Sequence, residues 1–520
     1  MTVYDYIIVG GGISGIYMTY KLQETGNKIL LVEGSNRLGG RIFTDQVKGV
    51  SMELGAGRIS KKHHKVMSLI RELNLDKELL ELPKDVQYKV SGPKIEFYGL
   101  INELYSEKKH YSKQYLETVS LLQYAIDVLG YKLAKVLQHQ FGYDAEFQYL
   151  NAYHALKAHK HDLFSDNPYY VVKSGLSSLV TEMESRFKDN VTIKLDTFVT
   201  DIGERYIQVG SKKYHGKYIF ACVPQKTLQG FSLFESIPQV SKVKSIPLIR
   251  IYAQYPKDKS GKVWFHKLKR TITDNYIRQI IPINVEQGLI MISYTDCLYA
   301  DMWNQLSKLT ESQLVSHLHK EIKTVLGIEP PKPIFVKSQY WSEGVHVWNP
   351  GCSVAKEYQT MLKPLDAYDI FVINESYSLH QGWIEGCLDM CYDVLDQLPD
   401  FSRTRIKGGK SNKPKVKLYT LQQVLKHRHW ILLDLRGKLR IYDVGKWMQK
   451  HPGGRDNLKR GIKANKYYKP NKTKADKLAY PQSPIQLFRS ISSHQSGKVI
   501  QTMLFQDNPF VKFIGFCKKV

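Results

Sequence analysis

The chain has few cysteines and no long hydrophobic run, and each absence excludes a class of protein. Six cysteines occur among 520 residues without the spacing of a disulfide framework, and Cys387 and Cys391 fit one helix face better than a zinc knuckle. No apolar stretch reaches the roughly 18 residues that a transmembrane helix requires. A signal peptide is not expected either, because an apolar strand already starts at Tyr4. We therefore expect a soluble, intracellular, cytoplasmic protein with reduced thiols.

Acidic residues are scarce toward the C-terminus. Residues 401–520 contain 28 Lys or Arg, five Asp and no Glu, a balance of +23 that leaves +3 of the total of +26 for the first 400 residues. This asymmetry predicts a separate domain over 417–520, joined by a basic linker over 399–416 to a first domain over 1–398. The positive charge leaves two explanations open: a lysine-rich solvated surface, or an anionic partner.

The N-terminus carries a glycine-rich turn between an apolar strand, residues 4–9, and an expected helix. Residues 10–15 read Gly-Gly-Gly-Ile-Ser-Gly. The first glycine permits the tight turn, the third lets a pyrophosphate approach bare backbone, and the last lets helix and strand pack closely. The helix N-terminus would face the phosphates. This pattern predicts a dinucleotide-binding α/β domain whose phosphate contacts include Gly10, Gly12, Ile13, Ser14 and Gly15.

A candidate ribose contact and a second glycine cluster follow, and the second cluster favours FAD over a nicotinamide cofactor. The second apolar strand, residues 28–32, ends at Glu33, eighteen residues after Gly15, where a carboxylate can accept hydrogen bonds from ribose hydroxyls. Gly39, Gly40 and Arg41 follow directly, and a flavoprotein needs such a second stretch of small backbone along the diphosphate. The alternative is a glycine-rich turn in an unrelated α/β domain.

With the further motif Met-Glu-Leu-Gly-Ala-Gly-Arg at residues 52–58, the first 398 residues resemble the flavin-containing amine oxidase superfamily. This superfamily includes monoamine, polyamine and L-amino-acid oxidases. The resemblance implies an α/β, Rossmann-like FAD/NAD(P)-binding domain of the GR2 type, combined with a helical and mixed-sheet substrate domain. Helical patterns from about 100 to 161 look like the family's insertion over the substrate cavity.

Two later motifs resemble the family's remaining FAD contacts. Residues 198–202 match the strand whose valine, here Val199, meets the adenine through its backbone. Residues 371–376 and 382–386 resemble the last FAD motif, which implies that Glu375 meets the ribityl-phosphate region. The helix that begins at Trp383 and Ile384 would direct its positive end at the flavin. Asn374 stands where the family usually has glycine.

The resemblance also implies a substrate face. Residues 340–348 resemble the segment that crosses the flavin ring in monoamine oxidases. Trp383 and His346 would form the two walls that enclose the amine. Val345 stands where those enzymes carry the cysteine that bonds to flavin, so we expect non-covalent FAD. The alternative is that the tryptophans are plain core aromatics.

Two basic residues are candidates for the reaction itself. Arg58 matches the arginine that holds the substrate carboxylate in L-amino-acid oxidases, and a guanidinium suits a carboxylate bidentately. The alternative is that Arg58 pairs with a flavin phosphate or an internal carboxylate. The family's active-site lysine falls at Lys269, with Lys267 as second choice and a surface role as the alternative.

Residues 417–520 resemble cytochrome b5, which implies a small α+β domain that binds haem b. The resemblance rests on residues 419–424, 430–433 and 441–447, followed by His-Pro-Gly-Gly at 451–454. It makes His451 one axial iron ligand. The second is expected at His494, beyond a Lys- and Tyr-rich stretch from 463 to 480 that reads as an insertion. If His494 is not the ligand, the domain binds haem through one ligand or not at all.

Together these motifs predict an FAD-dependent oxidoreductase that oxidises the C–N bond of an amine or amino acid and passes electrons to oxygen or to the fused haem. One alternative is an FAD-dependent dehydrogenase or desaturase with the haem domain as acceptor. The other is a weakly catalytic flavoprotein that a basic C-terminal module localises on an anion or nucleic acid.

Overall fold

The structure is a computed structural model of the 520-residue chain. It describes residues 3–162, 168–399 and 401, together with the backbone of four strands within residues 417–517. The chain divides into two compact units, Met1–Gly408 and Gly409–Val520, which are described separately.

The first unit contains a mainly parallel sheet built on the N-terminal strand. β1 (Val3–Val9) lies between β12 (Lys212–Ala221) and β2 (Ile29–Val32), and every side chain of β2 is buried. Such burial on both faces is typical of a parallel α/β sheet. The sheet is completed by β9 (Val191–Lys194) and β18 (Ile370–Val372), both parallel, and by the antiparallel β10 (Asp201–Gly203) and β11 (Tyr206–Val209).

Three helices lie beside this sheet: α1 (Ile13–Leu22), α9 (Ser177–Glu184) and α14 (Ile384–Leu395). Helix α1 packs against both of the others. The predicted first strand and helix are therefore confirmed. Cys387 and Cys391 both lie on α14, as their spacing indicated, and both are buried.

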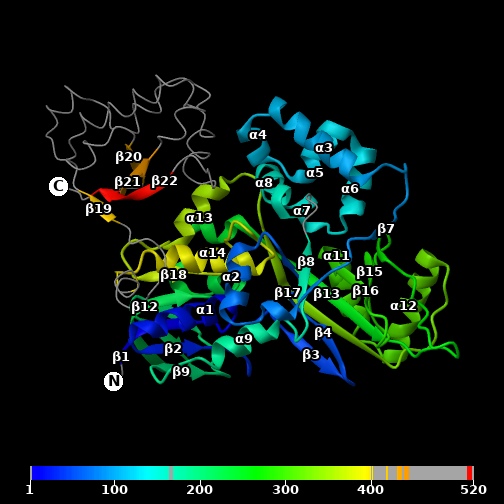
Figure 1. The fold of residues 1–520 in the computed structure, drawn as a ribbon, viewed down its shortest axis with the longest axis horizontal. Helices are drawn as coiled ribbons and strands as arrows, with labels where there is room; N and C mark the ends of the chain where they lie inside the picture. The colour runs from blue at the N-terminus through cyan, green and yellow to red at the C-terminus, as the bar shows by residue number, and fades with distance from the viewer. Residues whose placement is uncertain are drawn as a thin grey trace. The chain divides into compact units, whose positions relative to one another are not determined.

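A second, mixed sheet lies beside the first (Figure 1). Its order is β17 (Phe335–Trp348), β13 (Val243–Gln254), β16 (Leu289–Asp296), β15 (Gln279–Asn284), β14 (Arg270–Thr273) and β7 (Val86–Lys89). Helices α11 (Cys297–Leu306) and α12 (Glu311–Leu326) share its apolar core. Thr310 caps α12 through a capping box with Gln313, which satisfies two of the free N–H groups at its start.

Six helices form a third part of this unit, drawn in blue to cyan in Figure 1. They are α3 (Phe97–Glu107), α4 (Lys113–Thr118), α5 (Leu121–Leu129), α6 (Tyr131–Phe141), α7 (Ala145–Gln148) and α8 (Ala152–Asp162). They occupy the region where helical patterns are expected. Ser112 and Ser120 cap α4 and α5, and Gly130, with φ of +76°, makes the turn from α5 to α6.

Smaller elements connect these parts: β3 (Thr44–Val47), β4 (Val50–Glu53), β5 (Ile59–Ser60), β6 (Leu79–Glu81), β8 (Tyr169–Val172), α2 (His64–Glu72), α10 (Gln225–Gln229) and α13 (Val354–Leu362). Over the described residues, no helix has the length and hydrophobicity to cross a lipid bilayer.

In the second unit the structure describes one four-stranded sheet, in the order β19 (Lys417–Tyr419), β22 (Lys512–Cys517), β21 (Lys438–Asp443) and β20 (Trp430–Leu435). β20 and β21 pair antiparallel, and β19 runs parallel to β22. Both predicted haem ligands, His451 and His494, and most of the basic linker lie outside the described residues.

Candidate active site

The two glycine clusters form one backbone cradle at the start of α1. Gly10 has φ of +102°, and a Cβ added to Gly15 would stand 2.0 Å from the Gly10 carbonyl oxygen, so both glycines are required by the fold. The Gly39 N–H donates to the Gly11 carbonyl at 2.8 Å. A Cβ on Gly40 would lie 3.2 Å from the Gly12 Cα. The second cluster is therefore held directly against the first.

Gly12 leaves open space where a diphosphate would lie. A Cβ added there would meet nothing within 4 Å, and no side chain caps the N-terminus of α1. The N–H groups of the first helical turn, at Ile13 and Ser14, thus remain available to an anion. The cradle fits the diphosphate of FAD.

Glu33 stands at the end of β2, where a ribose contact is expected. Its carboxylate accepts from the Gly11 N–H at 2.6 Å and from the backbone and hydroxyl of Ser35 at 2.9 and 2.7 Å. A carboxylate has about four acceptor positions, so one remains for a ligand hydroxyl. Val199 lies at the same cavity and is buried; it precedes β10, which begins at Asp201.

One cavity of about 1550 Å³ extends from this cradle to the substrate sheet. Sites for single small ligands are typically about 300–1000 Å³, so the cavity has room for a dinucleotide and a substrate. Gly15 is packed inside the turn and does not line it. The other predicted residues of this unit all line it: Gly10, Gly12, Ile13, Ser14, Glu33, Gly40, Arg41, Arg58, Val199, Lys269, His346, Glu375, Trp383 and Ile384.

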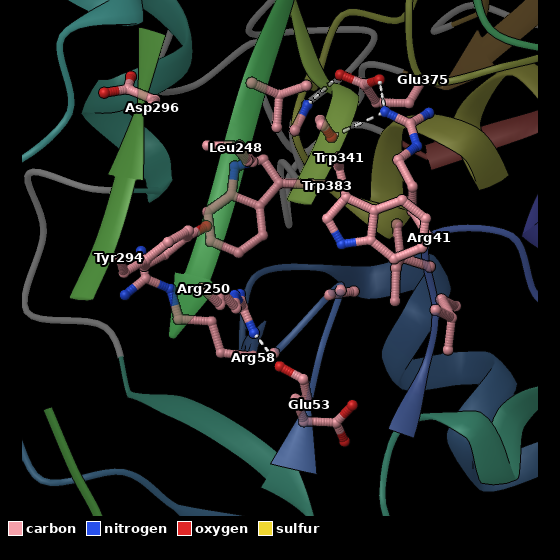
Figure 2. A pocket seen from close by; sticks show the side chains of 18 of the residues that line it. Arg41, Glu53, Arg58, Leu248, Arg250, Tyr294, Asp296, Trp341, Glu375 and Trp383 are labelled. Atoms are coloured by element: carbon pink, nitrogen blue, oxygen red, sulfur yellow. Dashed lines mark hydrogen bonds and ion pairs between the residues drawn. The ribbon is translucent and has the colours of Figure 1, made fainter. Parts of the chain in front are cut away.

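Glu375 connects three distant motifs inside this cavity (Figure 2). The Arg41 guanidinium and the His346 Nδ1 each lie 2.8 Å from Glu375 Oε2. The backbone N–H groups of His346 and Gly382 donate to Oε1 at 3.0 and 2.7 Å. Burial raises the pKa of Glu375, but Arg41 and His346 outweigh it and hold the pKa below its usual value. Protein groups therefore occupy all four acceptor positions of the Glu375 carboxylate. The resemblance implies a different contact for Glu375, with the ribityl-phosphate region of FAD.

His346 is a buried titratable residue in this network. Its Nε2 lies 3.3 Å from the Glu343 carboxylate, while its Nδ1 faces Glu375. Burial lowers the pKa of His346, yet the two carboxylates outweigh it and raise the pKa. The resemblance implies that His346 is an aromatic wall of the substrate site. The structure shows a ring whose two nitrogens both face carboxylates.

Trp383 instead has Tyr169 as its parallel neighbour. The two rings lie 6.0 Å apart between centroids, with an interplanar angle of 12°. The His63 ring meets Trp383 edge-on, with 4.7 Å between the ring centroids. Trp341 is half-buried and donates from its indole nitrogen to the Leu54 carbonyl at 2.8 Å. Tyr169 opens β8 and gives no sequence signal for this contact.

The Arg58 guanidinium lies against the two parallel rings, 4.8 Å from the Tyr169 centroid and 5.6 Å from that of Trp383. Over residues 3–162 and 168–399, it forms no ion pair with a carboxylate and no hydrogen bond. The alternative was that Arg58 pairs with an internal carboxylate, and no such partner occurs over these residues. Arg250, its neighbour in Figure 2, donates to the Glu53 carbonyl at 2.7 Å and lies 4.6 Å from the Tyr294 ring.

Lys269 is at the edge of the cavity. Its ammonium lies 3.1 Å from Asp85, and its side chain is 59% exposed. Lys267 is exposed and does not line the cavity. The adjacent Arg270 does line it and donates to Gln279 at 2.7 Å.

Sequence reasoning also missed two acids on the cavity wall, Glu146 and Asp296. Asp296 accepts from the backbone N–H groups of Asp144 and Ala145, and burial raises its pKa to about 6. Burial and the nearby Asp296 and Asp144 raise the pKa of Glu146 to about 8. Arg250 and Asp296 could have been found as charged residues within or at the end of apolar strands, where an unpaired charge is costly. Glu146 carries no such signal.

The comparison with protein families agrees with this geometry. The family described as flavin containing amine oxidoreductase matches residues 13–389, more than half of the chain. The chain belongs to this family, and FAD is the cofactor that membership and the glycine cradle imply.

Individual relatives match over short stretches. Achacin of Lissachatina fulica is 45% identical over 82 residues, which are 15% of this chain and 15% of achacin. L-amino-acid oxidase of Mus musculus is 39% identical over 72 residues, 14% of this chain and 11% of that enzyme. The chain thus aligns with 15% or less of the length of these two relatives.

The fold has a fuller counterpart. The structure of putrescine oxidase bound to putrescine covers 76% of this chain and 99% of its own, with a TM-score of 0.61 at 14% identity. That similarity shows the fold alone.

Proposed function

We propose that the chain is an FAD-dependent oxidase that oxidises the C–N bond of amines and amino acids, with an α-amino acid as its substrate of choice. The observation that carries this proposal is the guanidinium of Arg58, which faces the cavity beside Trp383 without a carboxylate partner in the described residues. A planar guanidinium holds a carboxylate through two parallel hydrogen bonds.

The reaction converts the substrate amine to an imine, which water hydrolyses. The α-carbon loses a hydride and the nitrogen a proton; water then adds and ammonia leaves, which gives the 2-oxo acid. When bound, FAD supplies the acceptor for the hydride, and dioxygen takes the two electrons and two protons as hydrogen peroxide. FAD is held without a covalent bond, because Val345 offers no nucleophile at the position where monoamine oxidases carry cysteine.

The residues of the cavity would orient the substrate and exclude water. Arg58 fixes the carboxylate, and the parallel rings of Trp383 and Tyr169 pack beside it. Where the bound substrate excludes water, the carboxylate contact would gain strength. Glu375 holds the Gly382 N–H at 2.7 Å and so fixes the loop that carries Trp383.

Anaerobic flavin reduction tests this function. Each α-amino acid is compared with the amine that remains after its decarboxylation, and the loss of flavin absorbance is followed over time. We expect the amino acid to reduce the flavin faster at equal concentration. Equal rates for both members of every pair would contradict the assignment of a carboxylate site to Arg58.

We propose in addition that the C-terminal unit binds haem b through His451 and His494 and accepts electrons singly from the reduced flavin. The sequence His-Pro-Gly-Gly at 451–454 supports this. Bis-histidine ligation suits electron transfer. The basic charge of this unit would suit an anionic partner.

An absorption spectrum of the full chain tests the haem. We expect a Soret band beside the flavin bands, and His494→Ala should turn the iron high-spin because one axial position opens. Flavin bands without a Soret band, after expression with excess haem, would contradict it.

A further inference from the structure

Part of the cavity wall is made of hydrogen-bond acceptors. It is formed by the end of α6, by α7 and by the end of β16, which contribute Gln140, Glu146 and Asp296. Gln140 is 7% exposed and donates from Nε2 to the Ile95 carbonyl at 2.9 Å, whereas its Oε1 has no hydrogen-bond partner among the described residues. A buried acceptor without a donor is costly unless a ligand supplies one.

Donors close to this wall bind other acids. Arg278 lies 3.3 Å from Asp144, and the N–H groups at the start of α7 bind Asp296. Glu146 has no cation within ion-pair distance in the described part of the chain. Burial, together with the neighbouring Asp296 and Asp144, makes its ionised form unfavourable, which is why its pKa is raised to about 8. A cation delivered by a ligand would offset this cost.

Arg58 contributes a positive charge to the same cavity. It lies close enough to Glu146 to lower the pKa of that carboxyl, yet the two side chains form no ion pair. A positive and a negative group from different segments, Arg58 before β5 and Glu146 on α7, therefore line one cavity without pairing with each other. A ligand that spans them needs an anionic group at one end and a cationic group at the other.

We propose that the substrate is an α-amino acid with a cationic side chain, such as lysine or ornithine, whose distal ammonium binds Glu146 and the free Oε1 of Gln140. The inference rests on the proposed function, since Arg58 must hold the α-carboxylate for the side chain to reach this wall. Glu146 and Gln140 then determine side-chain specificity and take no part in the oxidation itself.

Four compounds that differ by one charged group each test the inference on the full-length holoenzyme. Lysine carries both groups, norleucine lacks the distal ammonium, cadaverine lacks the carboxylate, and pentylamine lacks both. We expect kcat/KM for lysine to exceed that for norleucine by at least about ten-fold, because a charge-assisted hydrogen bond is lost. Norleucine equal to or better than lysine would overturn the inference, even where both exceed their decarboxylated partners.

The proposed function fails in a different pattern. If lysine equals cadaverine and norleucine equals pentylamine, the carboxylate is not recognised, whichever side chain is preferred. The four rates therefore separate the two failures without any variant.

Glu146→Gln tests the residue. It keeps the volume and removes the charge, so kcat/KM for lysine should fall about ten-fold or more while that for norleucine stays within about two-fold. Glu103→Gln, which removes the same charge from an exposed position on α3, should change neither. An unchanged preference for lysine in Glu146→Gln would overturn the assignment of this residue.

Discussion

The carboxylate of Glu375 accepts a hydrogen bond from the guanidinium of Arg41 at 2.8 Å across 334 residues of chain. This contact joins the second glycine cluster to the last cofactor motif. It lies inside the cavity, with Glu375 4% exposed. Because His346 and Gly382 share the same carboxylate, the cofactor cradle and the substrate face are held as one structure.

Glu375→Gln should therefore destabilise the first unit strongly. The change leaves Arg41 and His346 without their shared counterion, and breaking one partner of a buried ion pair costs about 3–5 kcal/mol. Chemical denaturation measures the loss. Glu182→Gln serves as control, because Glu182 pairs with Arg186 at 3.3 Å on the surface of α9, where an ion pair contributes about 1 kcal/mol or less. Equal losses for the two variants would show that the network is not a buried one.

Gly12→Ala and Gly15→Ala separate cofactor binding from folding. The methyl group introduced by Gly12→Ala would enter open space at φ of −73°, so the apoprotein should keep its stability or gain up to about 1 kcal/mol. FAD affinity should fall, since this methyl group occupies the path of the diphosphate. Gly15→Ala should lower the melting temperature of the apoprotein, because its Cβ would clash with the Gly10 carbonyl. Full FAD affinity in Gly12→Ala would place the diphosphate elsewhere.

Such glycine contacts are also the part of the site that the sequence predicted best. A tight turn or a close backbone approach constrains residue type locally, so residues 10–15 and 39–41 indicate the cradle from their identities and spacing alone. The same local constraint made the first strand and helix predictable, and the structure confirms both within an α/β sheet.

The substrate face was less predictable because its members meet only in the folded chain. Three of its members come from separate elements: Tyr169 from β8, Glu146 from α7 and Asp296 from β16. No local sequence pattern indicates that they line the same cavity. His346 illustrates the other difficulty. Its position along the chain matched an aromatic wall, whereas its surroundings, two carboxylates, depend on Glu343 and Glu375 together.

The stability of the substrate-free protein should depend on pH through Glu146. Its folded pKa of about 8 lies above the ordinary value of 4.5, so the folded state keeps a proton that the unfolded chain has released. The free energy of unfolding should consequently fall as pH rises from about 4.5 to about 8. Glu146→Gln removes this contribution, so its advantage over the unchanged protein should grow across that window. Parallel curves of melting temperature against pH would contradict the raised pKa.

FAD should be released completely on acid precipitation. Val345, at the position where monoamine oxidases carry the bonding cysteine, has no group that can bond to the flavin. The supernatant should carry all the flavin absorbance, and yellow colour retained in the washed pellet would contradict non-covalent binding.

The role of Arg58 as the carboxylate site is tested most directly by Arg58→Lys, assayed with an α-amino acid and with its decarboxylated amine. Lysine keeps the charge and loses the two-pronged contact, so kcat/KM for the amino acid should fall about ten- to hundred-fold, the equivalent of roughly 1.5–3 kcal/mol. The amine should change by less than about three-fold, as should both substrates in the exposed control Arg71→Lys. An equal loss for the amino acid and the amine would contradict the account and assign Arg58 to the cofactor or the fold.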